Sequence, residues 1–226
     1  MTQIRVECIL KVIELIISAI PSLVAVFLGA WLAFKFQNLA RKKETRANAV
    51  AAGNRTIFTL MRQYNSLLLL QRDIIEPARS HPLRFVAMLP SLNLDYKDLK
   101  FDIDSLSFIL ETSHRHCLAD LFMAEQKFQT AMLLFDERSR LHLQTVQPLL
   151  EKAGLIENNN GTCTTKQEVE GVLGARVSNY LSRLTDDAIE HIDLAVKDLK
   201  ETSDNLNRAL KQLYPEGQFI NFEPLK

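Results

Sequence analysis

Residues 15–34 constrain this chain more than any other feature, because all 20 are uncharged (LIISAIPSLVAVFLGAWLAF). A helix needs about 20 such residues to cross the roughly 30 Å hydrocarbon core of a bilayer. The stretch is apolar on every helical face, whereas a helix on the surface of a soluble domain keeps one polar face. Basic residues follow it, not the small residues of a signal-peptide cleavage site. We therefore predict a retained transmembrane helix over residues 15–34, rather than a buried core helix or a cleaved signal.

The charges that flank this stretch predict its orientation. Residues 1–14 carry two bases and two acids, whereas residues 35–46 carry one acid and five bases: Lys35, Arg41, Lys42, Lys43 and Arg46. Basic residues next to a span stay in the cytoplasm. We expect residues 1–14 to form a short extracytoplasmic N-terminus and the remainder to lie in the cytoplasm of a bacterium, anchored to its inner (plasma) membrane. The five bases are then candidate contacts for anionic lipid headgroups.

Small side chains repeat along one stripe of the predicted span. They are separated by four, three, four and four residues: Ser18, Ser22, Ala25, Gly29 and Ala33. Small residues at this spacing let two helix backbones approach closely in lipid. The pattern predicts self-association through this stripe, although alanine and glycine are also common in spans that do not associate.

The composition favours an all-α fold without a disulfide framework. The chain has only 7 glycines and 7 prolines, fewer than turn-rich β proteins usually carry, and three widely spaced cysteines, which suit a reducing compartment. Lysine plus arginine equals aspartate plus glutamate at 27 each, so a nucleic-acid partner is not expected.

The remaining chain predicts long helices. A juxtamembrane helix is expected over residues 35–76, with Gly53 as its weak point and with Pro77 ending it. Within the cytoplasmic helical domain, residues 77–226, an irregular crossing segment precedes helices near residues 104–152 and 165–213. Thr165 and Glu168 form a capping-box pattern at the start of the last helix.

The apolar spacing of the last helix indicates how these helices pack. Apolar residues recur every three or four positions from Leu173 to Leu213, as in a coiled coil or helix bundle. We expect a coiled-coil-like, antiparallel bundle of long helices that continues from the transmembrane helix. The tail after Pro215 and Gly217 contains Phe219, Ile220 and Phe222, and either folds back or docks on a partner.

No motif of a known enzyme class is present. The sequence lacks a phosphate-binding loop, a dinucleotide-binding glycine pattern, a nucleophile elbow and a paired-cysteine zinc motif. His114, His116 and Cys117 cluster, but residues two positions apart on a helix point in nearly opposite directions and cannot share an ion. We expect no enzyme activity, no metal and no cofactor.

Arg138 and His142 are weak candidates for a catalytic pair. They resemble the arginine–histidine motif of HEPN ribonucleases, whose arginine and histidine act on the scissile phosphate. Three residues separate Arg138 from His142, fewer than the four to six of that family, so the resemblance implies a non-catalytic domain. A span followed by a helical domain is similar to the HEPN-like membrane pore proteins that accompany some CRISPR ribonucleases.

Three hypotheses for function follow. The first is a membrane anchor, scaffold or signalling protein whose cytoplasmic helices form a homo-oligomer or bind an unknown protein. The second is an oligomeric pore-forming effector of anti-phage defence. The third is a membrane-tethered ribonuclease that uses Arg138 and His142.

Overall fold

The computed structural model describes residues 2–91, 96, 98–155 and 165–222, and side chains at residue 21 and from residue 23 onward within these ranges. It is helical, without strands among the described residues. The chain divides into two compact units, Met1–Asn48 and Ala49–Lys226. Helix α1 (Thr2–Leu70) supplies all the described structure of the first unit and the first helix of the second. The transmembrane and juxtamembrane helices expected over residues 15–34 and 35–76 therefore lie largely within one longer helix.

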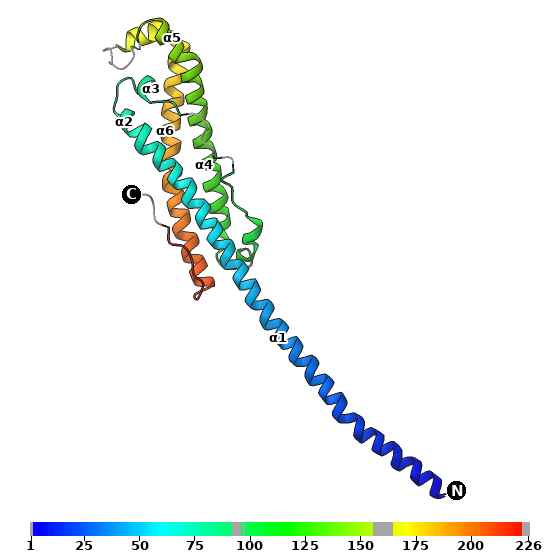
Figure 1. Cartoon of the computed structure of the whole chain (residues 1–226). Coiled ribbons are helices and arrows are strands. Elements are labelled where there is room, and N and C mark those ends of the chain that lie inside the picture. Colours follow the sequence, from blue (N-terminus) through cyan, green and yellow to red (C-terminus); the bar gives the residue numbers. More distant parts are fainter. Residues whose placement is uncertain (1, 92–95, 97, 156–164, 223–226) are drawn as a thin grey trace. The chain divides into compact units, whose positions relative to one another are not determined.

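The second unit is built around α6 (Lys166–Leu213), which runs antiparallel to two other helices. Gln71, just after α1, donates to Asp193 at 2.7 Å, and Gly53 lies against Leu210. Helices α1 and α6 therefore run in opposite directions. Lys127 and Arg138 of α4 (His116–Leu141) pair with Asp198 and Thr185 in the same opposite order. In Figure 1, α4 and α6 lie side by side along their lengths. It follows that α4 runs parallel to the second half of α1.

Parallel neighbours require a connection that returns along the bundle, and the described residues 80–91, 96 and 98–115 belong to it. It includes the short helix α3 (Arg84–Ala87) and the 3₁₀ helix η2 (Asp104–Ile109). The Gln63 side chain donates to the Leu99 carbonyl at 2.7 Å, which fixes the returning chain against α1. The helix expected from residue 104 begins as η2, and α4 begins only at His116, after turns near residue 112.

Two prolines, Pro77 and Pro148, lie within helical paths and do not end them. The π turn η1 (Gln71–Ile75) precedes α2 (Glu76–Arg79), and the π turn η3 (His142–Val146) precedes α5 (Gln147–Lys152). Each proline lies in the first turn of the following segment, where its missing N–H and fixed φ are tolerated. The predicted stop at Pro77 is therefore wrong: the helical path continues to Arg79.

The last helix starts as the sequence predicts. Thr165 accepts a hydrogen bond from the Glu168 amide at 3.3 Å, and the Glu168 carboxylate accepts one from the Thr165 amide at 2.8 Å, so the capping box is confirmed. A kink follows at Gly174, whose φ of 73° and ψ of 152° favour glycine. The expected apolar stripe is only partly buried, because Tyr180 is 49% exposed while Leu181 is fully buried.

The core lies where α1, α4 and α6 meet. It is lined mainly by leucine, isoleucine, alanine and phenylalanine side chains, among them Ile57, Leu60, Leu67, Leu121, Phe128, Phe135, Ile192, Leu199 and Leu206. A second, smaller cluster lies where α3, η3 and α5 meet the start of α6, around Phe85, Val146, Leu150 and Leu181. These two clusters position the polar groups described next.

Candidate functional sites

The first candidate site is the apolar surface of α1 in the first unit. Among the residues with described side chains, one helix near the N-terminus is long and apolar enough to span a membrane. None of its most apolar window is buried. Exposed large side chains occur at ten positions: Leu23, Val24, Val26, Phe27, Leu28, Trp31, Leu32, Phe34, Phe36 and Leu39. Such an apolar surface requires a cover of lipid or protein.

The small-residue stripe is open on this surface. Ala25, Gly29 and Ala33 are exposed, and a Cβ added at Gly29 would have no neighbour within 4 Å. Ser18 and Ser22 lie outside the residues with described side chains. The described part of the stripe can therefore accept a second helix without rearrangement.

Charged side chains follow the apolar surface. The Lys35 ammonium lies over the Trp31 ring, 5.0 Å from its centroid, in a cation–π contact. Arg41, Lys42 and Lys43 are exposed, whereas Arg46 is half-buried. An aromatic ring beside a lysine is typical of the boundary between hydrocarbon and headgroups.

The catalytic candidates Arg138 and His142 lie inside the second unit. Arg138 is fully buried, and its Nη2 donates to the carbonyls of Phe85, at 3.1 Å, and Met88. His142 is 6% exposed, and its Nε2 lies 3.1 Å from the Val86 carbonyl. We call these three contacts the carbonyl clasp. They satisfy carbonyls at the end of α3 that its single turn leaves without intrahelical partners.

Burial changes the acid–base properties of the clasp. Desolvation lowers the pKa of Arg138 to about 10, and no carboxylate compensates its charge among the described contacts. Desolvation, assisted by the Arg138 charge, lowers the pKa of His142 to about 4. His142 is therefore neutral at pH 7, with its Nε2–H donated to Val86. In this arrangement both groups bind backbone carbonyls and their side chains are almost completely buried.

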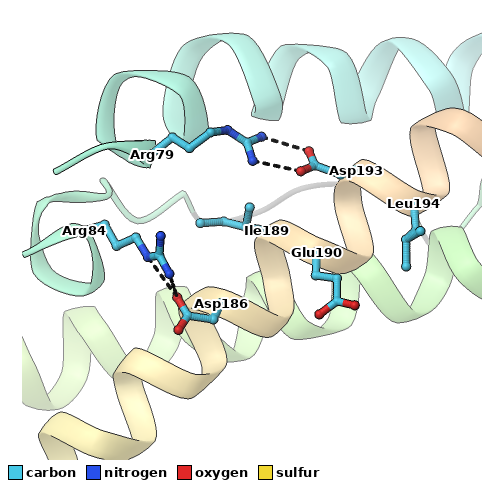
Figure 2. A pocket seen from close by; sticks show the side chains of 7 residues that line it. All are labelled: Arg79, Arg84, Asp186, Ile189, Glu190, Asp193 and Leu194. Carbon is cyan, nitrogen blue, oxygen red and sulfur yellow. Dashed lines mark hydrogen bonds and ion pairs between the residues drawn. The ribbon is translucent and has the colours of Figure 1, made fainter. Parts of the chain in front are cut away.

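A second polar cluster fixes α2 and α3 to α6 around a pocket of about 310 Å³ (Figure 2). Arg79 donates to both carboxylate oxygens of Asp193, at 2.8 and 2.9 Å, and Arg84 pairs with Asp186 at 2.8 Å. Ile189 lies between the two pairs in Figure 2. Both guanidinium groups already have carboxylate partners. The two ion pairs therefore hold α2 and α3 against α6.

The side chains of the histidine–cysteine cluster differ in burial. Cys117 is buried, His116 is exposed, and the rings of His114 and His116 are 6.3 Å apart. Within the described part of the chain, no three histidine, cysteine or acidic side chains come together in a way that could hold a metal ion.

The sequence did not indicate how the C-terminal segment docks on α1. Asn54 donates through Nδ2 to the Gln218 carbonyl and accepts through Oδ1 from the Ile220 amide, both at 2.9 Å. The Phe222 ring packs edge-on against Tyr64 at 5.1 Å. We call residues 217–222 the C-terminal strap. Of the two possibilities for this tail, the structure places the described part on its own chain.

The strap also explains Gly53. A Cβ at this position would lie 2.8 Å from Leu210 Cδ1 and 3.1 Å from Phe219 Cε1, closer than ordinary contacts. The glycine that weakens α1 thus allows α6 and the strap to approach the helix. No sequence signal connects Gly53 with residues more than 150 positions away.

Comparison with known proteins leaves these sites to be interpreted on their own geometry. No protein-family model, no curated protein and no solved structure matches this chain.

Proposed function

We propose that the chain is a single-pass protein of the bacterial inner membrane whose second unit forms homo-oligomers or binds a protein partner as a scaffold or signalling element. The exposed apolar surface at residues 23–39 carries this proposal. Leaving ten large apolar side chains in water instead of lipid costs on the order of 10–20 kcal/mol, at about 1–2 kcal/mol for each.

The charge distribution supports an orientation. Lys35 and the exposed bases at residues 41–43 follow the apolar surface, and such bases remain on the cytoplasmic side. Residues 1–14 are then extracytoplasmic, and Ala49–Lys226 is cytoplasmic. The bases at residues 35–46 bind anionic headgroups in this arrangement, with Lys35 extending from Trp31 to the interface.

Cysteine labelling tests the orientation. Thr2→Cys and Lys226→Cys are introduced separately into a chain whose native cysteines have been replaced, and intact spheroplasts are treated with a membrane-impermeant maleimide. We expect labelling at position 2 in intact spheroplasts and at position 226 only after lysis. The reverse pattern, or release of the chain by carbonate washing, would refute the proposal.

The open small-residue stripe supports a second candidate, an oligomeric pore-forming effector of anti-phage or CRISPR-associated defence. A helix with Ala25, Gly29 and Ala33 on one exposed face can pack closely with copies of itself. One span cannot enclose a pore, so this candidate requires several. The ribonuclease candidate has less support, because Arg138 and His142 are committed to the carbonyl clasp.

Light scattering of the full-length protein in detergent separates the two candidates. A complex of four or more copies that dissociates on Gly29→Leu, together with leakage from dye-loaded vesicles, favours the pore. Phe27→Leu is the matched control, because residue 27 lies on the opposite face of the helix from residue 29. A monomer or dimer that is insensitive to Gly29→Leu favours the scaffold.

A further inference from the structure

The surface beneath the C-terminal strap is built to hold an extended peptide. Asn54 binds a carbonyl and an amide two residues apart, at Gln218 and Ile220, as a neighbouring β-strand does. These contacts recognise the backbone of the bound segment. The aromatic rings of Phe219 and Phe222 provide the side-chain specificity, one against Gly53 and the other against Tyr64.

The docking surface is specified by the helices and not by the strap itself. Gly53 allows the close approach at this surface, because the Cβ of a larger residue would lie too near Leu210 of α6. Tyr64, which is 7% exposed with the strap in place, also packs within the hydrophobic core of the helices. The receiving surface therefore has a defined shape contributed by α1 and α6.

No residue of the strap is fully buried, and only Phe219 and Phe222 pack against the core, whereas the surface that receives the strap belongs to the core helices. The strap joins α6 through a turn at residues 214–217, in which the Gly217 amide donates to the Tyr214 carbonyl at 2.8 Å. Ile220 is 40% exposed, and two of the strap's hydrogen bonds depend on one asparagine. Segments with few buried contacts open locally at low cost.

We propose that the strap of one copy also occupies the α1 surface of a second copy, so that strap exchange joins copies of this chain. An exchanged strap makes the same contacts as an intramolecular one, and only the turn at residues 214–217 changes, which is the low-cost route to association by domain swapping. Confinement of copies to one membrane raises their effective concentration and favours exchange. The inference rests on the proposed membrane-bound homo-oligomer and names the surface that forms it.

Photocrosslinking of the full-length protein tests the exchange. Phe222 is replaced by p-benzoylphenylalanine, an aromatic residue that crosslinks its neighbours, and ¹⁵N-labelled and unlabelled copies are co-reconstituted and irradiated. We expect a dimer on a denaturing gel whose crosslinked peptides join the strap of one isotopic form to the Tyr64 region of the other. Adding Asn54→Leu removes both backbone hydrogen bonds and lowers the yield of this product roughly tenfold. The probe at Phe122, which is 51% exposed on α4, is the matched control for random contact and gives no such peptide.

Each alternative result decides the question. Strap-to-α1 crosslinks only within one isotopic form would overturn exchange. A dimer joined through other peptides, and insensitive to Asn54→Leu, would overturn exchange while leaving the proposed oligomer intact. A wild-type protein that is monomeric by light scattering would remove the homo-oligomer and strap exchange together, leaving partner binding as the scaffold function. Light scattering of Asn54→Leu without the probe, with a smaller expected mass than wild type, checks that the probe did not create the result.

Discussion

Acidification should destabilise the second unit through His142. Burial and the nearby Arg138 charge lower the pKa of this imidazole from 6.5 to about 4. Between these two pH values the unfolded chain binds a proton that the folded chain does not, so lowering the pH favours unfolding. Above pH 6.5 the imidazole is neutral in both states, and its contribution is independent of pH.

The magnitude follows from the width of this window. Each pH unit inside it changes the free energy of unfolding by about 1.4 kcal/mol. Between pH 7.5 and pH 5 the wild type should lose about 2 kcal/mol through His142, since pH 5 lies about 1.5 units below the pKa in the unfolded chain. The loss approaches about 3 kcal/mol near pH 4, where the folded state also begins to bind the proton.

The assay compares wild type with His142→Gln. A glutamine amide can still donate to the Val86 carbonyl, but it does not titrate. Urea unfolding of the full-length protein in a nonionic detergent, followed by circular dichroism at several pH values, gives the free energy of unfolding of each. The difference in free energy of unfolding between wild type and His142→Gln should shrink by about 2 kcal/mol from pH 7.5 to pH 5. Parallel pH profiles would refute the buried, neutral imidazole.

The same unfolding assay tests three further side chains. Arg138→Met leaves the carbonyls of Phe85 and Met88 without their donor and should cost about 2–4 kcal/mol; a loss below about 0.5 kcal/mol would contradict the clasp. Asp193→Asn weakens the bidentate pair with Arg79 and should lower the free energy of unfolding by about 1 kcal/mol, because both side chains are about one-third exposed and water screens their charges. Glu201→Gln, in a well-solvated pair with Lys197, is the control and should change the free energy of unfolding by less than about 0.5 kcal/mol. Thr165→Ala removes the capping box and should cost about 1 kcal/mol, with faster hydrogen exchange confined to the first turn of α6; exchange that increased along all of α6 would contradict a local role.

Local features of this fold were predictable from sequence, and long-range ones were not. The apolar helix and the Thr165 capping box depend on residues within one or a few turns of each other. The stop at Pro77 was wrong because a π turn accommodates the proline without ending the helical path. The preference of a residue before proline for extended backbone is a tendency, and packing around Ile75, which is fully buried, outweighs it here.

The candidate sites show the same limit. Arg138 and His142 have the spacing of a solvated pair on one helix face, yet both are buried, because α3 places its carbonyls beside them from more than 50 residues away. Chain topology determines which groups a buried arginine meets. Likewise, Gly53 is a helix-weakening residue in sequence and a close-packing residue only when Phe219 and Leu210 are in place.

The late position of α6 and the strap in the chain has a consequence for biosynthesis. The face of α1 that carries Asn54 and Tyr64 is covered by α6 and the strap, which leave the ribosome much later than α1. At about 5–20 residues per second, the roughly 150 residues in between take on the order of 10–30 s to synthesise. During that interval α1 has emerged but lacks the helix that buries it, so the nascent chain offers a targeting or chaperone factor an apolar helical face that the finished protein conceals.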